Sequence, residues 1–296
     1  MFSHIFGKFL IEQNLISEDK LKEVTQYEKN IRVKLGLIAV TEKLISKEQA
    51  DRINRRQTME DKKFGDIAVE QGYLTEGQVE RLLKLQGNPY LVFVQAMTEK
   101  GFMTMEEIEY AMEMYQRTYG FTSTDMEDLK SGDVDRIVPL FVRSKNKFAE
   151  ELAGVAIRTI IRLIDSHIGI GISYEAQRYE FENLAFQNVE GEHEIMLGFA
   201  AEGNNLLSIA STFANEDFEE MDVYSFDAVC EFINCINGLY ASKLSGDGVM
   251  VDMLPPTFLQ SGWMKVEDKV LIIPIYIKNQ KVRIVIAIDT QVGITS

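Results

Sequence analysis

The hydrophobic and polar positions of the first 116 residues repeat with a period of 29 residues. Each unit begins with an apolar residue followed by a glycine, and Gly7, Gly36 and Gly65 are each 29 residues apart. A fourth unit keeps the pattern but has Val94 at the glycine position. Apolar residues within the units recur at the three- and four-residue spacing of amphipathic helices. The period therefore predicts four helical pairs that bury a shared core by stacking or bundling.

A serine or threonine marks the start of the second helix in each predicted pair. Ser17, Ser46, Thr75 and Thr104 share the 29-residue period, and each precedes an apolar-periodic run. In the last three units a glutamine or glutamate follows three residues later, which is the pattern of a capping box. Residues 1–116 are therefore predicted to form an all-helical repeat module. The next 30 residues, 117–146, are richer in Ser, Thr, Gly and Asp and predict a linker with about one helical turn.

From residue 147 to residue 296 the pattern alternates irregularly between helices and strands. Helices are predicted over 148–167, 205–215 and about 222–244. Strands are predicted over YEFENLAFQNV, HEIMLGFAAE, VMVDML, KVLIIPIYIK and KVRIVIAID, the last two joined by a two-residue turn at Asn279–Gln280. This order predicts an α+β domain with helices packed on one face of a mostly antiparallel sheet.

The helix predicted over 222–244 has two unlike faces. Asp227, Glu231, Asn234 and Gly238 follow one another at steps of four, three and four, so they lie on one helical face. The opposite stripe is apolar and consists of Phe226, Val229, Cys230, Ile233, Ile236 and Tyr240. A well-anchored helix is therefore predicted to present a carboxylate, an amide and a bare glycine to the outside.

The charge is unevenly distributed between the two predicted modules. Residues 1–145 carry 21 Lys/Arg and 24 Asp/Glu, whereas residues 146–296 carry 10 and 22, so the net charges are −3 and −12. Such an acidic surface repels nucleic acid and anionic lipid, and neither is predicted as a partner. No apolar run is long enough to span a bilayer and no signal peptide is evident, so a cytoplasmic location is expected.

Other reactive side chains form no recognisable catalytic pattern. His4, His167 and His193 are scattered and have neither metal-ligand nor triad spacing, so no metal site is predicted. Cys230 and Cys235 are predicted to be apolar packing residues. The chain also lacks a glycine-rich phosphate loop and a nucleophile elbow.

The repeat module resembles the N-terminal domain of type II secretion and type IV pilus assembly ATPases. One branch of that family binds cyclic di-GMP through tandem motifs that begin Arg-Leu-Gly, contain a later glycine and end in glutamine. The resemblance implies these nucleotide-binding candidates: Lys34, Gly36, Gln57, Lys63, Gly65, Gly72 and Gln86. Lysines replace the arginines in units two and three, and Lys43 replaces the later glycine of unit two. The alternative is an interaction module whose glycines only permit close packing.

The order of elements after residue 147 resembles the CheX and CheC family of chemotaxis phosphatases, over about residues 147–290. The family signature is an Asp or Ser, a Glu, an Asn and a later Pro, which Asp227, Glu231, Asn234 and Pro256 match in spacing. Two further Glu-x-x-Asn pairs, Glu180/Asn183 and Glu202/Asn205, lack the preceding aspartate and the following proline. The context, rather than the pair alone, identifies the motif.

The resemblance implies roles for the residues of this face. Asn234 is expected to orient a water, and Glu231 is expected to pair with a lysine of a phosphorylated CheY-like response regulator. Asp227, Asn237 and Gly238 are the predicted partner-docking residues. The chain is expected to need no cofactor of its own, because the receiver domain of the partner carries the Mg²⁺.

A second implication concerns the number of sites and of subunits. CheC-type members have another Glu-x-x-Asn pair on their first helix, but here Glu151 is followed three residues later by Gly154. A single-site, CheX-like domain that forms a homodimer is therefore expected.

Together these features predict a two-module signalling protein. The C-terminal domain is predicted to be a phosphatase for the phosphoaspartate of a receiver domain, and the repeats are predicted to sense or dock. The alternatives are a non-catalytic signalling adaptor and a module that acts by binding cyclic di-GMP through its repeats.

Overall fold

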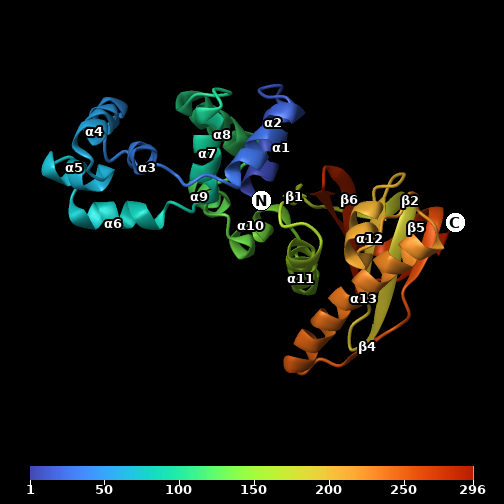
Figure 1. Ribbon diagram of the computed structural model, residues 1–296. Coiled ribbons are helices and arrows are strands. Elements are labelled where there is room, and N and C mark those ends of the chain that lie inside the picture. The colour runs from blue at the N-terminus through green and yellow to red at the C-terminus, as the bar shows by residue number, and fades with distance from the viewer. Residues whose placement is uncertain (296) are drawn as a thin grey trace. The chain divides into compact units, whose positions relative to one another are not determined.

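The computed structural model describes residues 1–295, and Figure 1 shows its α+β architecture. Helices make up the N-terminal part, and an antiparallel sheet with packed helices makes up the C-terminal part, which confirms the predicted fold class. The chain divides into two compact units. One contains Phe2 and Phe6–Asp133, and the other is formed mainly by the chain from Val134 onward.

The first unit contains the predicted helical pairs, two helices to each 29-residue repeat. They are α1 (Phe2–Glu12), α2 (Glu18–Glu28), α3 (Leu35–Thr41), α4 (Lys47–Glu60), α5 (Phe64–Glu70), α6 (Glu76–Lys84), α7 (Pro89–Glu99) and α8 (Met105–Tyr119). The side chains of Ser46, Thr75 and Thr104 cap α4, α6 and α8 in reciprocal capping boxes. These boxes confirm that the Ser/Thr period marks helix starts.

The turn inside each pair uses a left-handed backbone conformation. Asn14, Lys43, Gly72 and Gly101 have φ values of 57°, 55°, 70° and 67° and are spaced by 29 residues. Glycine adopts this conformation without the steric cost of a Cβ, and Lys43 adopts it at some cost. The later glycine of the repeat therefore serves the turn.

The first glycine of units one to three permits close packing with a neighbouring side chain. A Cβ on Gly65 would lie 2.7 Å from Val79 Cγ1, and a Cβ on Gly36 would lie 2.9 Å from Phe64 Cε2. These distances are shorter than real Cβ contacts, so the bare backbone makes room for the neighbouring side chain.

The four repeats pack as two pairs. Units one and four form what we call the outer pair, in which Phe6 and Phe9 contact Tyr115 and Phe6 contacts Phe93, with ring centroids 5.0–5.8 Å apart. Units two and three form the inner pair, in which α3 packs on α5 and α6 and α4 packs on α5. Aromatic side chains therefore fill the contact between the outer units.

The range predicted as a linker, 117–146, contains two further helices, α9 (Ser123–Ser131) and α10 (Val134–Phe141). Thr122 caps α9 in a capping box with Asp125, and Gly132 ends it in the left-handed conformation. Residues typical of loops act here as helix caps, so the prediction of about one helical turn was wrong.

The second unit is built around an antiparallel sheet of the order β1-β5-β6-β3-β2-β4, with β7 paired to β5. Its elements after α10 are α11 (Lys147–Leu163), β1 (Gly169–Ile170), β2 (Tyr174–Gly191), β3 (Ile195–Ala201), α12 (Leu207–Ala214), α13 (Val223–Gly246), β4 (Val251–Met253), β5 (Thr257–Ile277), β6 (Gln280–Ile288) and β7 (Val292–Thr295). The β5–β6 turn is Lys278–Asn279, one residue earlier than predicted, because both residues have positive φ, as two-residue hairpin turns require.

The two faces of the sheet are buried in different ways. Helix α13 covers one face, where Phe232 contacts Phe199 of β3 at a centroid distance of 5.8 Å. Strand β5 pairs with both β6 and β2, so β2, β3, β6 and β5 close a ring whose other face encloses a second core. This core contains Phe181, Phe186 and Met264 among its large side chains. All seven residues of β3 are therefore buried.

Candidate functional site

The first candidate site is the outward face of α13. Asp222 starts this helix in a capping box with Ser225, and the predicted apolar stripe from Phe226 to Tyr240 is buried. Tyr240 also donates a hydrogen bond to the carbonyl of Phe148 at the start of α11. The helix is thus fixed at its N-terminus and along its inner face, which gives the outer face a rigid support.

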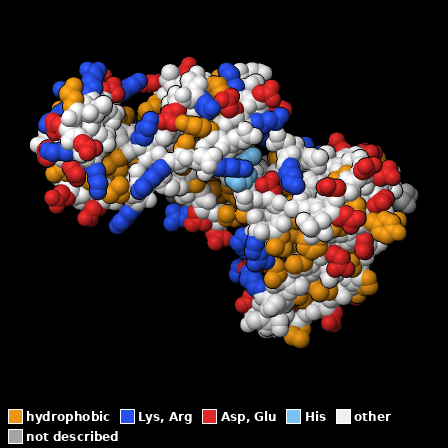
Figure 2. Space-filling model, in the orientation of Figure 1, with side chains coloured by type: hydrophobic (Ala, Val, Ile, Leu, Met, Phe, Trp, Pro, Cys, Tyr) orange, Lys and Arg blue, Asp and Glu red, His pale blue; other side chains and the backbone are white. Residues whose placement is uncertain are grey.

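The predicted polar residues do share the outer face. Asp227 and Glu231 are exposed, and Asn234 and Gly238 are half-buried. Hydrophobic side chains also reach the surface nearby, among them Tyr224 of α13 and Met253 of β4, which lies beside Gly238. Figure 2 shows hydrophobic side chains gathered over α13 with acidic side chains beside them. This mixture of apolar and acidic groups is a surface that another protein can cover.

Asn237 does not belong to this surface, and its predicted docking role is wrong. It is 1% exposed, and its Nδ2 donates to Gln187 Oε1 at 2.9 Å. Two successive steps of three, from Glu231 to Asn234 and on to Asn237, rotate about 120° around the helix, so Asn237 turns inward, toward β2.

Gln187 is a site residue that the sequence interpretation missed. It lies on β2, is 1% exposed, and donates from Nε2 to Asn234 Oδ1 at 2.8 Å. The same Nε2 donates to the carbonyl of Leu254, also at 2.8 Å, just before the proline pair. The motif helix and the proline segment thus meet at one buried carboxamide. A single glutamine at an inward strand position, between Ala185 and Val189, was the available signal.

The two other Glu-x-x-Asn pairs have structural partners instead. Asn183 is buried on β2 and donates to the Gly203 carbonyl at 2.7 Å, while Glu202 accepts from Arg283. Asn205 donates to the Lys281 carbonyl. Neither pair lies on an open helical face, in agreement with the sequence interpretation.

Glu151 of α11, considered in the sequence analysis for a second Glu/Asn pair, has a structural partner. It forms an ion pair with Lys243 of α13, and this hydrogen bond lowers the pKa of Glu151 below its usual value. Because Gly154 follows where an asparagine would be needed, α11 presents no Glu/Asn pair.

Cys230 lies next to the polar face but on the buried side of α13. Burial, with smaller contributions from the charges of Asp227 and Glu231, raises the pKa of its thiol to about 11. The thiol is therefore protonated at neutral pH and is a packing group rather than a nucleophile.

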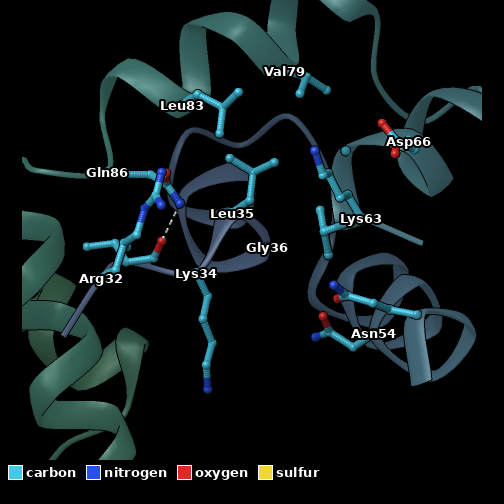
Figure 3. A pocket seen from close by; sticks show the side chains of 14 residues that line it. Arg32, Lys34, Leu35, Gly36, Asn54, Lys63, Asp66, Val79, Leu83 and Gln86 are labelled. Carbon is cyan, nitrogen blue, oxygen red and sulfur yellow. Dashed lines mark hydrogen bonds between the residues drawn. The ribbon is translucent and has the colours of Figure 1, made fainter. Parts of the chain in front are cut away.

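The second candidate site is a cavity of about 860 Å³ within the inner repeat pair (Figure 3). Six of the seven nucleotide candidates line it: Lys34, Gly36, Gln57, Lys63, Gly65 and Gln86. Gly72 does not line the cavity. It lies in the turn after α5, where a Cβ would meet nothing within 4 Å. Apolar walls come from Val33, Leu35, Phe64, Val79 and Leu83.

Two of the candidate residues already have partners within the protein. Lys34 pairs with Glu99 at 2.5 Å, and in Figure 3 its side chain extends away from Gln86 and Lys63. Gln86 donates to the Val33 carbonyl at 2.8 Å and accepts from Arg32 Nε at 2.9 Å. These two side chains therefore help to hold the segment that leads into α3.

Two polar side chains of the cavity are open to a ligand. Within residues 1–295, the side chains of Lys63 and Gln57 have no hydrogen-bond or ion-pair partner. Arg32 adds a guanidinium that the sequence interpretation missed, two residues before the motif lysine. Because Asp66 is the one acid in the lining, cationic side chains outnumber acidic ones.

A family model matches the part of the chain that contains the α13 face and not the part that contains the cavity. Residues 184–286 match the model of a family described as chemotaxis phosphatase CheX. The match includes Gln187, Glu231, Asn234 and the segment Leu254–Pro256, so the α13 face lies in a CheX-like domain. A search of curated proteins finds no match to the chain.

Several solved structures are similar to this chain over about half its length. A CheC-like superfamily protein from Shewanella sp. PV-4 shares 16% identity, with 49% of this chain and 99% of that chain covered and a TM-score of 0.41. A CheX protein from Desulfovibrio desulfuricans shares 13% identity, with 48% and 99% covered and a TM-score of 0.42. A CheX–CheY–BeF₃–Mg²⁺ complex from Borrelia burgdorferi shares 17% identity, with 51% and 99% covered and a TM-score of 0.38.

Two further findings concern metal ions and membranes. Residues 1–295 contain no group of three or more His, Cys, Asp or Glu side chains placed to hold a metal ion. In the same residues, no helix has the length and apolar character needed to cross a membrane.

Proposed function

We propose that the CheX-like domain hydrolyses the phosphoaspartate of a CheY-like receiver domain. In this proposal Asn234 orients the attacking water, Glu231 pairs with the receiver's lysine, and Asp227 and Gly238 lie at the docking surface. The observation that carries it is a half-buried amide beside an exposed carboxylate on a rigid helix, within the stretch that matches the CheX family.

The phosphatase itself needs to supply only a few groups for this reaction. A phosphorylated receiver holds its own Mg²⁺, so hydrolysis requires a water in line with the breaking bond and groups that stabilise the transferred charge. A neutral amide can accept from and donate to that water without adding negative charge beside the phosphoryl group. Asn234 supplies such an amide, and Glu231 is exposed one helical turn away from it.

The test is the decay rate of a phosphorylated receiver, measured with excess Mg²⁺ and with saturating full-length protein. Wild type is expected to accelerate decay, and Asn234→Ala is expected to lose roughly 10²-fold in the saturated rate, as is typical when an orienting group is removed. Asn205→Ala is the matched control, because Asn205 is also half-buried and belongs to a Glu-x-x-Asn pair away from α13.

Two other outcomes would change the conclusion. If the receiver binds but its decay is unchanged by wild type, the non-catalytic adaptor describes the protein. If Asn205→Ala loses as much as Asn234→Ala, the amide of α13 has no special role. Light scattering of the same full-length samples tests the expected homodimer.

A second candidate function follows from the cavity of the inner repeat pair. It is the binding of cyclic di-GMP, supported by the gathering of six motif residues around one cavity with free cationic and amide groups. Phosphates would pair with Lys63 and Arg32, and the apolar walls would contact the bases.

Calorimetry of full-length protein with cyclic di-GMP tests this function. Lys63→Ala is expected to weaken binding about tenfold, because it removes one charge-assisted contact to a phosphate. Lys62→Ala is the matched control, since Lys62 pairs with Glu70 and does not line the cavity. No heat with the wild-type protein at high micromolar nucleotide would remove this candidate and leave the repeats as a packing and interaction module.

A further inference from the structure

We propose that Gln187 is a positioning residue that fixes the orientation of the Asn234 amide on the outer face of α13. Its effect on hydrolysis rests on the function proposed above, whereas its effect on the amide itself does not. Gln187 lies on β2 opposite Leu197 of β3 and points toward α13, where it contacts two asparagines of one helix.

The orientation of Gln187 is determined by the backbone. The Leu254 carbonyl can only accept a hydrogen bond, so the group that faces it must be the Nε2 end of Gln187. The other end, Oε1, then accepts from Asn237 Nδ2 at 2.9 Å. Both hydrogens of Nε2 are used, one by Leu254 and one by Asn234. Gln187 therefore has one arrangement, and its mirror placement would set an oxygen against a carbonyl.

This arrangement determines which end of Asn234 faces inward. Because Nε2 of Gln187 is a donor, Asn234 must turn its Oδ1 toward it. Rotating the Asn234 amide by half a turn would place two donors against each other and leave the buried Nε2 without one acceptor. The Nδ2 group and the second lone pair of Oδ1 then have a fixed direction relative to a water on the outer face.

Fixing this amide in advance bears directly on an in-line reaction. A water held by a freely rotating amide would be aligned with the breaking bond for only part of the time. The Leu254 carbonyl fixes the orientation of Gln187, and Gln187 in turn fixes the Asn234 amide before a partner binds. The proline segment after β4 is thereby linked to the motif helix through Gln187.

The catalytic test compares Gln187→Met with Asn183→Leu in the receiver-decay assay. Asn183 is the matched control, because it is also a buried amide on β2, four residues away on the same face of the strand, but it bonds the Gly203 carbonyl. Gln187→Met is expected to lower the saturated rate about tenfold with an unchanged half-saturating concentration, since misplaced groups typically cost up to 10²-fold. Asn183→Leu is expected to keep the wild-type rate.

A double variant separates positioning from general support of the fold. In the Asn234→Ala background, Gln187→Met is expected to have no further effect on the rate, because the amide that it positions is gone. A further tenfold loss in that background would overturn the positioning role. If Gln187→Met fails to fold, Gln187→Glu replaces it, because it keeps the size and the acceptor for Asn237 while removing both donors.

An activity-independent measurement keeps the inference testable if no receiver is hydrolysed. The order parameter of the Asn234 side-chain amide, from ¹⁵N relaxation of the full chain, is expected to be near 0.8 in wild type and below about 0.6 in the Gln187 variant. An equally rigid amide in both proteins would overturn the inference. A rigid wild-type amide that loosens in the variant, without any acceleration of receiver decay, would remove the proposed function alone.

Discussion

The two candidate sites differ in shape and in how many of their polar groups have partners in the protein. On α13 the charged groups are exposed on a convex helical surface, and the half-buried amide of Asn234 accepts a hydrogen bond from Gln187 on its inner side. In the inner repeat pair the polar groups surround a hollow, and two of them, Lys34 and Gln86, also hold the structure together. A convex face suits a macromolecular partner, whereas a hollow suits a small ligand.

The same contrast exists inside the repeat module. The inner pair has lysines at the start of its motifs and keeps a cavity, whereas the outer pair has Ile5 and Val92 at those positions. Aromatic contacts among Phe6, Phe93 and Tyr115 fill the contact of the outer pair. One repeat pattern thus produces either a packed core or a hollow, depending on the side chains at the contact between two units.

The largest effect is expected from reversing a charge on the outer face of α13. Glu231→Lys is expected to raise the half-saturating concentration in the receiver assay roughly 30-fold, about 2 kcal/mol, because like charges would then face the receiver's lysine. The unfolding temperature is expected to stay within 1–2 °C of wild type, since surface changes typically cost under about 0.5 kcal/mol. Glu267→Lys, at an exposed position of β5, is the control for the same change of net charge away from α13. A large fall in unfolding temperature would show that the α13 face is structural.

A smaller effect is expected from removing a polar group of the cavity. Gln86→Ala is expected to lower the free energy of unfolding by about 1.5 kcal/mol, because the Val33 carbonyl and Arg32 lose their partner. Gln57→Ala, measured by the same denaturant titration, is expected to change it by less than about 0.5 kcal/mol, since Gln57 is exposed and has no partner among residues 1–295. Equal effects of the two variants would contradict the division of the cavity residues into supporting and open groups.

The smallest expected effect concerns the bare glycine of the helix face. A Cβ on Gly238 would contact nothing closer than Met253 Cε at 3.9 Å, so Gly238→Ala fits the isolated domain. Alanine in a helix interior is expected to stabilise it by roughly 0.8 kcal/mol, measured by denaturant titration. If a partner approaches this point closely, the same variant should weaken receiver binding two- to threefold. Unchanged binding would mean that the docking surface ends before Gly238.

Much of the fold was predictable because it depends on local periodicity. The 29-residue spacing predicted the helical pairs and the capping boxes at Ser46, Thr75 and Thr104, which the structure contains. Sequence patterns predicted the fold less well where the same residue type is common both in loops and at helix ends. Thr122 and Gly132 looked like parts of a loop, yet they begin and end α9. The composition of a cap and that of a linker are nearly the same.

The site was predictable to the extent that a helix shows its faces in sequence. The spacing of Asp227, Glu231 and Asn234 predicted one polar face, but Asn237, which was predicted to dock a partner, is buried. Asn237 is polar and buried, and its Nδ2 donates there to Gln187, which partly offsets the cost of burying the amide. A pattern of hydrophobic positions cannot predict that a polar residue points into the core.

The sequence by itself determined the repeat, the acidic character of the second module and the helix that presents Glu231 and Asn234, because propensity, periodicity and charge belong to neighbouring residues. Tertiary structure alone decided that six motif residues from two repeats surround one cavity and that Arg32 joins them. It also decided that Gln187, 47 positions before Asn234, donates to both that amide and the Leu254 carbonyl. Such contacts depend on how strands and helices distant in sequence come together, and hydrogen-bond direction then fixes the orientation of each group.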